Sequence, residues 1–358
     1  MNVCESVLSL KPYQGGKPIS ELQRELGLER VVKLASNENP IGPGPKAMQA
    51  IAEAIDEVGR YPDGNGFELK KSIGEHLEVD YESITLGNGS NELLELIARL
   101  YLCNPDDEVI FSQYSFIVYS LVSQTLGAKS VVTPAINFGH DLKSMLSSIT
   151  KKTKLIYIAN PNNPTGTLLS DDEIHDFLSK VPSSVVVVLD QAYFEYLDID
   201  DNAVGWLDEF SNLIITRTFS KAYGLAGLRV GYSLSSIEIA DYINRVRQPF
   251  NVSHIAQSAA TAALTDDAFM VRSILANNNG LLQLSHGFDR MGLTYIPSFA
   301  NFIALKVDNA SSVYKLLLER GFIVRPIEVK GYLRVSVGTK NENDDFLDVL
   351  ESVLGLEK

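Results

Sequence analysis

Short apolar, β-branched runs alternate with longer amphipathic stretches between about residues 83 and 234. The runs are SITL, EVIF, SVVT, KLIYIA, SVVVVL, NLIITRT and RVGYSL, and helical patterns such as SNELLELIARLYL separate them. Strands that alternate with helices of this length predict a mostly parallel sheet with helices on both faces. The run VVVVL at 185–189 has no polar position, which is typical of a strand buried on both faces. We therefore expect an α/β fold whose large domain holds a mostly parallel, seven-stranded sheet.

The pattern changes after residue 250. A long helical stretch over 253–292 is followed by the strand-like runs NFIALKV, FIVRP and YLRVSV and by a closing helix around DDFLDVLESVL. This order predicts a smaller α+β domain, and a chain of 358 residues is long enough for two domains. We expect an N-terminal segment over 1–45 that contributes to the small domain, a large domain over 46–250 and a small domain over 251–358.

Composition excludes several classes of function. The chain carries 45 Asp and Glu against 31 Lys and Arg, a net charge of −14, which disfavours binding to nucleic acid. The two cysteines, Cys4 and Cys103, offer no disulfide framework, and the five histidines are scattered without ligand spacing, so we expect no metal site.

No segment of the sequence has the pattern of a signal peptide or of a membrane-spanning helix. The first residues, MNVCESVLSLKP, lack the basic start and the long apolar run of a signal peptide. VVVVL is far shorter than the run of about 18 apolar residues that a spanning helix needs. The sequence therefore predicts a cytoplasmic protein.

Polar residues gather directly after five of the predicted strands. In an open parallel sheet, ligands bind beyond the carboxyl ends of the strands, so these positions are the first candidates for a site. In chain order they are GNGSNE at 87–92, QYSF at 113–116, NPNNPTG at 160–166, DQAY at 190–193 and FSK at 219–221.

Each of these segments, taken alone, has a purely structural interpretation. GNGSNE can hold an anion at a helix N-terminus, or form a tight turn capped by Ser90. Asp190 is either a helix cap or a buried acid that needs a cationic partner, and Lys221 alone is most simply a solvated lysine. Asn163 can offer an amide or shape a turn, and Tyr114 can join the core or cover a planar ring.

The five segments together fit one cofactor. Pyridoxal phosphate requires a lysine for a Schiff base, a carboxylate to pair with its ring nitrogen, and donors for its phenolic oxygen and its phosphate. Lys221, Asp190, Tyr193 and the glycine-rich turn supply these groups. The combination favours an enzyme that binds this cofactor.

The chain resembles the fold type I, pyridoxal-phosphate-dependent aminotransferases over nearly its whole length, and most closely the histidinol-phosphate aminotransferase family. The motifs that carry the resemblance stand in the family's order: KPYQGGKP, KLASNENPIGPGP, RYPDG, GNGSNELL, NPNNPTG, DQAY, FSKAYGLAGLRVGY, RQPFNVSHIAQ and LRVSVGT. The resemblance implies a homodimer with shared active sites, to whose contacts the segment 1–45 contributes.

The resemblance also implies a role for each matching residue. Lys221 forms the Schiff base, Asp190 pairs with the ring nitrogen, and Tyr193 and Asn163 bind the ring oxygen. The other implied residues are Tyr114, stacked on the ring; Ser220, Arg229, Ser90 and Asn91 at the phosphate; Tyr61 from the partner subunit; Arg334 at the substrate's anionic group; and Tyr13, Asn37 and Arg325 as further substrate contacts. Asn91 stands where the family often has an aspartate, and SQYSF replaces the usual Pro-Thr before the ring-stacking aromatic residue.

The reaction implied is exchange of an amino group between L-histidinol phosphate and 2-oxoglutarate, giving imidazole-acetol phosphate and L-glutamate, in histidine biosynthesis. Lys221 would carry the proton between substrate and cofactor. Aminotransferases of aromatic amino acids and a threonine-phosphate decarboxylase share the cofactor motifs and stay open as alternatives. A binding protein without catalysis, with GNGSNE as its sole anion site, is the alternative from another class.

Overall fold

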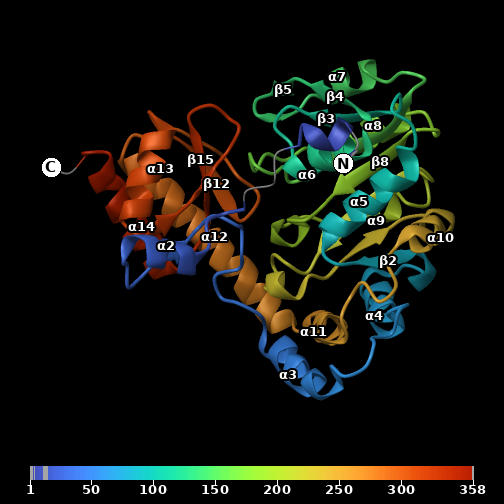
Figure 1. The fold of residues 1–358 in the computed structure, drawn as a ribbon, viewed down its shortest axis with the longest axis horizontal. Helices are drawn as coiled ribbons and strands as arrows, with labels where there is room; N and C mark the ends of the chain where they lie inside the picture. The colour runs from blue at the N-terminus through green and yellow to red at the C-terminus, as the bar shows by residue number, and fades with distance from the viewer. Residues whose placement is uncertain (1–2, 4, 11–14, 357–358) are drawn as a thin grey trace.

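The computed structural model describes residue 3, residues 5–10 and residues 15–356. Its large domain is built on a seven-stranded sheet (Figure 1). In spatial order the strands are β2 (Ile84–Gly87), β10 (Gly231–Leu234), β9 (Leu213–Thr218), β8 (Val186–Asp190), β7 (Thr153–Ala159), β3 (Glu108–Ser112) and β4 (Lys129–Thr133). β10 runs antiparallel to both of its neighbours, and the other pairs are parallel. The expected seven-stranded, mostly parallel sheet is confirmed.

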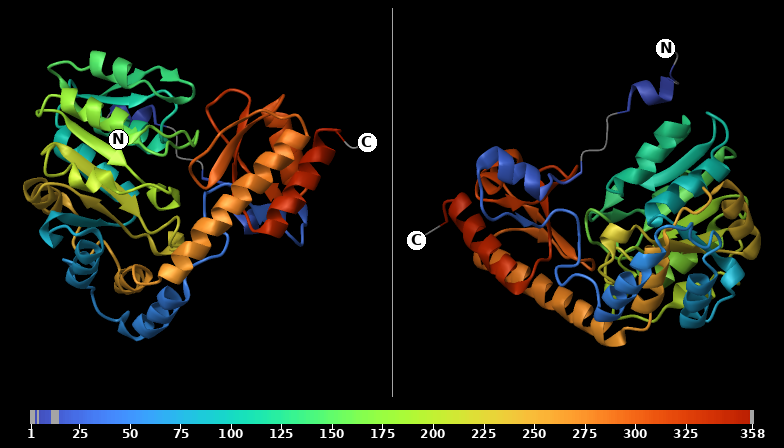
Figure 2. Two further views of the ribbon diagram at one scale, coloured as in Figure 1. Left: turned by 180° about the vertical axis from the view of Figure 1, so that it is seen from behind. Right: turned by 60° about the horizontal axis from the view of Figure 1, so that its bottom comes forward.

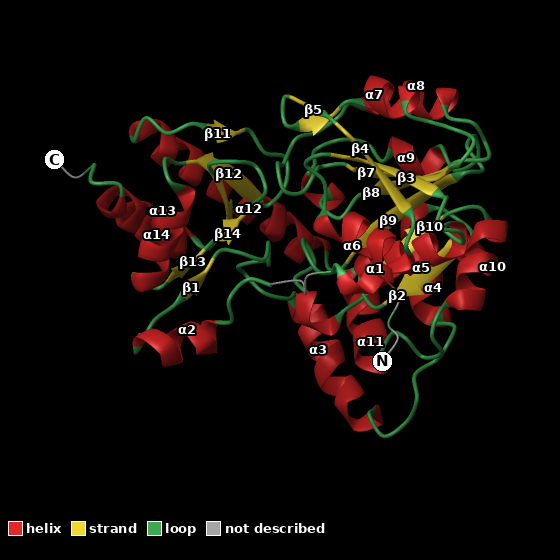
Figure 3. Cartoon of the chain, turned by 45° about the horizontal axis from the view of Figure 1, so that its top comes forward, coloured by secondary structure: helices red, strands yellow, loops and turns green. Residues whose placement is uncertain are grey.

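Helices cover both faces of this sheet (Figure 3). Val186 and Val188 point into a core shared with α5 (Ser90–Tyr101), α6 (Ile117–Leu126) and α10 (Ile237–Val246). Val187 and Leu189 point into the opposite core, which holds residues of α4 (Phe67–Leu77), α7 (Leu142–Ser147), α8 (Asp171–Lys180) and α11 (His254–Ala263). Successive side chains of a strand alternate between faces, so the uniformly apolar VVVVL run fills two cores at once.

The small domain pairs an antiparallel sheet with three helices. Its strands, in spatial order, are β11 (Tyr295–Ile296), β12 (Phe302–Lys306), β15 (Tyr332–Ser336) and β14 (Arg325–Pro326). One core joins α12 (Asp267–Arg290), α13 (Ala310–Glu319) and α14 (Lys340–Val353) to these strands. The N-terminal segment adds α2 (Ile19–Leu26) and β1 (Val32–Lys33), which pairs in parallel with β13 (Phe322–Ile323).

The long helical pattern after residue 250 forms two helices rather than one. α11 packs closely against α3 (Pro45–Ala54) and against α4, and its alanines belong to the core of the large domain. α12 begins after the cap Asp266 and runs from the large domain into the small one (Figure 2). This packing favours a domain boundary near the start of α12; the boundary at residue 250 and the other domain limits stay predictions.

The remaining elements are short. They are α1 (Glu5–Leu8), which contacts α6; α9 (Asn202–Gly205); the hairpin of β5 (Ala135–Ile136) and β6 (Gly139–His140); and the 3₁₀ turns η1 (Ile55–Glu57), η2 (Tyr81–Ser83), η3 (Phe194–Tyr196) and η4 (Ala226–Leu228). Within the described part of the chain, no helix combines the length and apolar character needed to cross a bilayer.

Candidate active site

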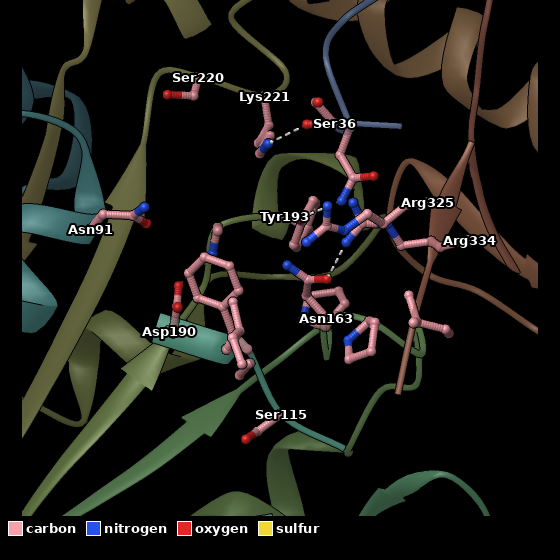
Figure 4. A pocket seen from close by; sticks show the side chains of 18 of the residues that line it. Ser36, Asn91, Ser115, Asn163, Asp190, Tyr193, Ser220, Lys221, Arg325 and Arg334 are labelled. Carbon is pink, nitrogen blue, oxygen red and sulfur yellow. Dashed lines mark hydrogen bonds between the residues drawn. The ribbon is translucent and has the colours of Figure 1, made fainter. Parts of the chain in front are cut away.

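A cavity of about 570 Å³ lies between the domains, at the carboxyl ends of β8 and β9. Of the expected site residues that the structure describes, all but Tyr61 line it. Asn91, Asp190 and Lys221 come from the large domain, whereas Arg325 and Arg334 come from the small one (Figure 4). The topology therefore gathers segments that are up to about 300 residues apart in sequence, such as Asn37 and Arg334, around one cavity.

Asp190 ends β8 and is 5% exposed. Its Oδ2 accepts a hydrogen bond from the hydroxyl of Tyr119 at 2.7 Å, and its Oδ1 accepts one from the backbone N–H of Ala192 at 3.2 Å. Burial raises the pKa of the Asp190 carboxyl above its usual value. A cation placed against this carboxylate would therefore gain an unusually favourable partner.

Lys221 follows β9, and because β9 is parallel to β8 it reaches the same edge of the sheet as Asp190. Its Nζ donates to the carbonyl of Ser36 at 3.2 Å. Burial, together with the positive charges of Arg334 and Arg229, lowers the pKa of Lys221 from 10.5 to about 7. An amine with this pKa is uncharged often enough near neutral pH to act as a nucleophile and as a proton carrier.

One end of the cavity carries groups that suit an anion. The Arg229 Nη1 donates to the Ser220 hydroxyl at 3.3 Å, and Ser90 begins α5, whose N-terminal N–H groups carry partial positive charge. Gly89 has a φ of 74°, and a Cβ placed there would come within 2.3 Å of the Arg229 guanidinium. Only glycine lets the guanidinium lie this close to the start of the helix.

A second cationic group lies at the small-domain end. Arg334 on β15 is 9% exposed; its Nη1 donates to Asn163 Oδ1 at 2.6 Å and its Nη2 to the carbonyl of Ala35 at 2.8 Å. Arg325 stands opposite it on the neighbouring strand β14. Two guanidinium groups on adjacent strands suit a phosphate or a carboxylate.

Asn37 holds the hydroxyl of Tyr193 in place. The Asn37 amide donates to Tyr193 Oη at 2.8 Å, and the Ser336 hydroxyl donates to Asn37 Oδ1 at 2.9 Å. Asn37 is buried and has a φ of 55°, a left-handed backbone that asparagine tolerates better than most residues. The segment KLASNENP thus links β15 to the DQAY turn.

Among the described residues, one expected site residue, Tyr61, is not brought to the cavity. Tyr61 is 82% exposed and stacks on Phe250, with ring centroids 4.7 Å apart, outside the cavity of its own chain. Tyr13 lies outside the described residues.

Two aromatic residues at this site, Phe116 and Tyr119, were not predicted from the sequence, whereas Tyr114 was. Tyr114 touches the cavity but stacks on Phe138, at 6.3 Å, which in turn contacts Tyr332 of the small domain. Phe116 lines the same cavity and meets the ring of Tyr119 edge-on at 5.9 Å, beside Asp190. The signal for both was present in FIVY, because residues three apart share one face at the start of a helix.

Comparison with known proteins identifies the family. The family model "Aminotransferase class I and II" matches residues 29–350. The histidinol-phosphate aminotransferase of Methylobacillus flagellatus is 52% identical over 356 residues, covering 98% of this chain and 96% of that protein. This chain belongs to the histidinol-phosphate aminotransferase family.

Two further members of the histidinol-phosphate aminotransferase family extend the comparison. The second histidinol-phosphate aminotransferase of Pasteurella multocida is 53% identical over 360 residues, covering 99% of this chain and 98% of that protein. The crystal structure of the Sinorhizobium meliloti enzyme in complex with pyridoxal-5'-phosphate superposes with a TM-score of 0.91 at 28% identity, covering 99% of this chain and 98% of that one. Among the described residues, no group of three or more His, Cys, Asp and Glu side chains is arranged to hold a metal ion.

Proposed function

We propose that this chain uses pyridoxal 5'-phosphate to move an amino group between L-histidinol phosphate and 2-oxoglutarate. The products are imidazole-acetol phosphate and L-glutamate, and we place the reaction in histidine biosynthesis in the cytoplasm. The observation that carries the proposal is an amine of lowered pKa, Lys221, in a cavity with separate anion-binding groups at its two ends. One end suits the cofactor's phosphate, and the other suits the anionic group of a substrate.

The residues present fit the cofactor. Asp190 would pair with the ring nitrogen, Tyr193 and Asn163 would bind the ring oxygen, and Phe116, rather than Tyr114, would cover one face of the ring. Ser220, Arg229 and the N-terminal N–H groups of α5 would hold the phosphate. When bound, the cofactor supplies an electron-withdrawing ring that stabilises negative charge on the substrate carbon.

The chain's own residues would do the rest of the chemistry. The Lys221 amine would move a proton between the substrate carbon that carries the amino group and carbon C4′ of the cofactor, for which a pKa of about 7 is well matched to neutral pH. Arg334 would bind the phosphate ester of histidinol phosphate in one half of the reaction and a carboxylate of glutamate in the other, since a guanidinium forms paired hydrogen bonds with either anion.

Turnover with defined amino donors tests this proposal. With 2-oxoglutarate present, we expect L-histidinol phosphate to be converted with the highest kcat/KM, ahead of phenylalanine, and threonine phosphate to release no carbon dioxide. Lys221→Ala should abolish transfer, and Lys46→Ala, at an exposed lysine outside the cavity, serves as the matched control. No turnover of histidinol phosphate by the wild-type protein would reject the substrate assignment.

We further propose that the active unit is a homodimer in which Tyr61 serves the site of the partner subunit. Large apolar side chains are exposed along α3 and the segment after it, among them Met48, Ile55 and Val58, and Tyr61 and Phe250 continue this surface. An apolar surface of this kind suits a second copy of the chain.

Mixing two inactive variants tests the shared site. In a dimer of Lys221→Ala with Tyr61→Ala, one of the two sites would keep both residues, so activity should return on mixing and subunit exchange. If both residues act within one subunit, mixing restores nothing, and a stable, fully active monomer in sedimentation would also reject the proposal.

A further inference from the structure

Tyr119 is completely buried, and its hydroxyl donates a hydrogen bond to the carboxylate of Asp190. Its Oη lies 2.7 Å from Asp190 Oδ2, a short distance typical of a hydroxyl that donates to an ionised acid. The opposite oxygen, Oδ1, receives the backbone N–H of Ala192 at 3.2 Å. The two donors approach different oxygens and so fix the plane in which the carboxylate lies.

Aromatic packing leaves the Tyr119 ring little freedom. It lies parallel to the ring of Tyr157, with centroids 4.4 Å apart, and meets Phe116 edge-on at 5.9 Å. Tyr157 is itself completely buried, and its hydroxyl donates to the carbonyl of Leu94 on α5 at 2.8 Å. The pair therefore joins β7, α5 and α6 beneath the cavity.

The Tyr119 hydroxyl affects the charge state of Asp190. Burial raises the pKa of Asp190, whereas the hydrogen bonds from Tyr119 and Ala192 and the charge of Lys221 act against that rise. Burial also raises the pKa of Tyr119 well above its usual value, so this hydroxyl stays protonated and remains a donor. Besides Lys221, the polar and titratable side chains around Asp190 come from α6, β7, β9 and the DQAY turn: Tyr119, Tyr157, Thr216 and Tyr193.

We propose that Tyr119 is a positioning residue that keeps Asp190 ionised and aims its carboxylate at the ring nitrogen of pyridoxal phosphate. The proposal rests on the proposed cofactor, but not on the choice of substrate. If Asp190 became neutral, it would no longer hold a proton on the ring nitrogen. The cofactor would then bind less tightly, and its ring would withdraw electrons less strongly.

Tyr119→Phe tests this role, and Tyr157→Phe is its matched control. Both changes remove one hydroxyl from the same stacked pair and keep the ring, but the Tyr157 hydroxyl bonds to Leu94 rather than to Asp190. Two readouts need no substrate: the Kd for pyridoxal phosphate added to the apoprotein, and the pH midpoint of the visible absorption change of the loaded protein.

For Tyr119→Phe we expect the Kd to rise about tenfold and the midpoint to move up by about one pH unit, since hydrogen bonds to charged groups have about this strength and a less positive ring holds protons more tightly. Tyr157→Phe should show wild-type values for both. If the Kd and the midpoint of Tyr119→Phe are unshifted, or if both variants shift equally, the inference on Tyr119 is wrong and the proposed function still stands. A wild-type protein that binds no pyridoxal phosphate would overturn both this inference and the proposed function.

Discussion

The two cationic ends of the cavity are constructed differently. The Ser220–Arg229 end lies within the large domain, where a turn, a glycine and the start of α5 stand on one sheet. The Arg334 end is assembled from three parts of the chain: the guanidinium lies in the small domain, Asn163 in the large domain and Ala35 in the N-terminal segment. Binding of the cofactor's phosphate should therefore depend on the large domain, whereas substrate binding should depend on how the two domains and the N-terminal segment meet.

The largest effect should come from Arg334→Lys. The variant keeps the positive charge but loses the paired donors, so we expect kcat/KM to fall about 100-fold or more for histidinol phosphate and for glutamate, with the Kd for pyridoxal phosphate unchanged. Steady-state kinetics and a cofactor titration measure the two quantities, and Arg320→Lys, at an exposed arginine of the small domain outside the cavity, is the matched control. A loss confined to one of the two substrates would show that the other binds elsewhere.

Arg229→Ala should have the complementary effect. We expect the Kd for pyridoxal phosphate to rise about 10- to 100-fold because one charged partner of the phosphate is lost, while excess cofactor restores most of the turnover. Arg245→Ala removes an exposed arginine whose ion pair with Asp241 lies on α10, and it should bind the cofactor as the wild type does. An Arg229→Ala protein whose weak activity ignores added cofactor would contradict the preformed phosphate end.

The smallest effect concerns pH. The pKa of Lys221 is lowered to about 7, so the uncharged amine that attacks an aldehyde predominates above pH 7 and falls about tenfold per unit below it. The rate of cofactor uptake by the apoprotein should follow this curve when it is recorded by absorbance at several pH values. Because the charge of Arg334 helps to lower the pKa, Arg334→Ala should move the midpoint upward. A rate that stays flat from pH 6 to 9 would argue against a titrating Lys221.

Much of the fold was predictable because each strand of the large sheet has a local signal, a short apolar run, in the sequence. The seven β-branched runs of the large domain all form strands of one sheet, since a run of alternating or continuous apolar residues has few other ways to be buried. The break between α11 and α12 was not predicted. It depends on Asp266, which caps α12 and also accepts a hydrogen bond from the backbone N–H of Lys46. These two residues are 220 positions apart in the sequence.

Sequence patterns located the cavity better than they assigned its aromatic residues. Tyr114 and Phe116 are two positions apart, and which one covers the ring depends on where the chain turns into α6, whose cap is Phe116. The partner of Tyr119 is 71 residues away on β8, so its spacing in the helix could suggest only a core residue. The assignments of Lys221 and Asp190 needed no such long-range information, because Asp190 ends β8 and Lys221 lies three residues after the end of β9. Their chemical roles, like those of the other site residues, stay predictions.

α12 is a rigid connection between the two domains. Its 24 residues, Asp267–Arg290, span about 36 Å. The helix begins after the cap Asp266 in the large domain, and Leu284 and Phe288 near its far end lie in the core that also holds β15. A rotation of about 5° at the cap would carry the far end about 3 Å, roughly the length of one hydrogen bond. The reach of Arg334 toward a substrate is therefore set partly by the angle at which a helix leaves its cap on the other side of the molecule.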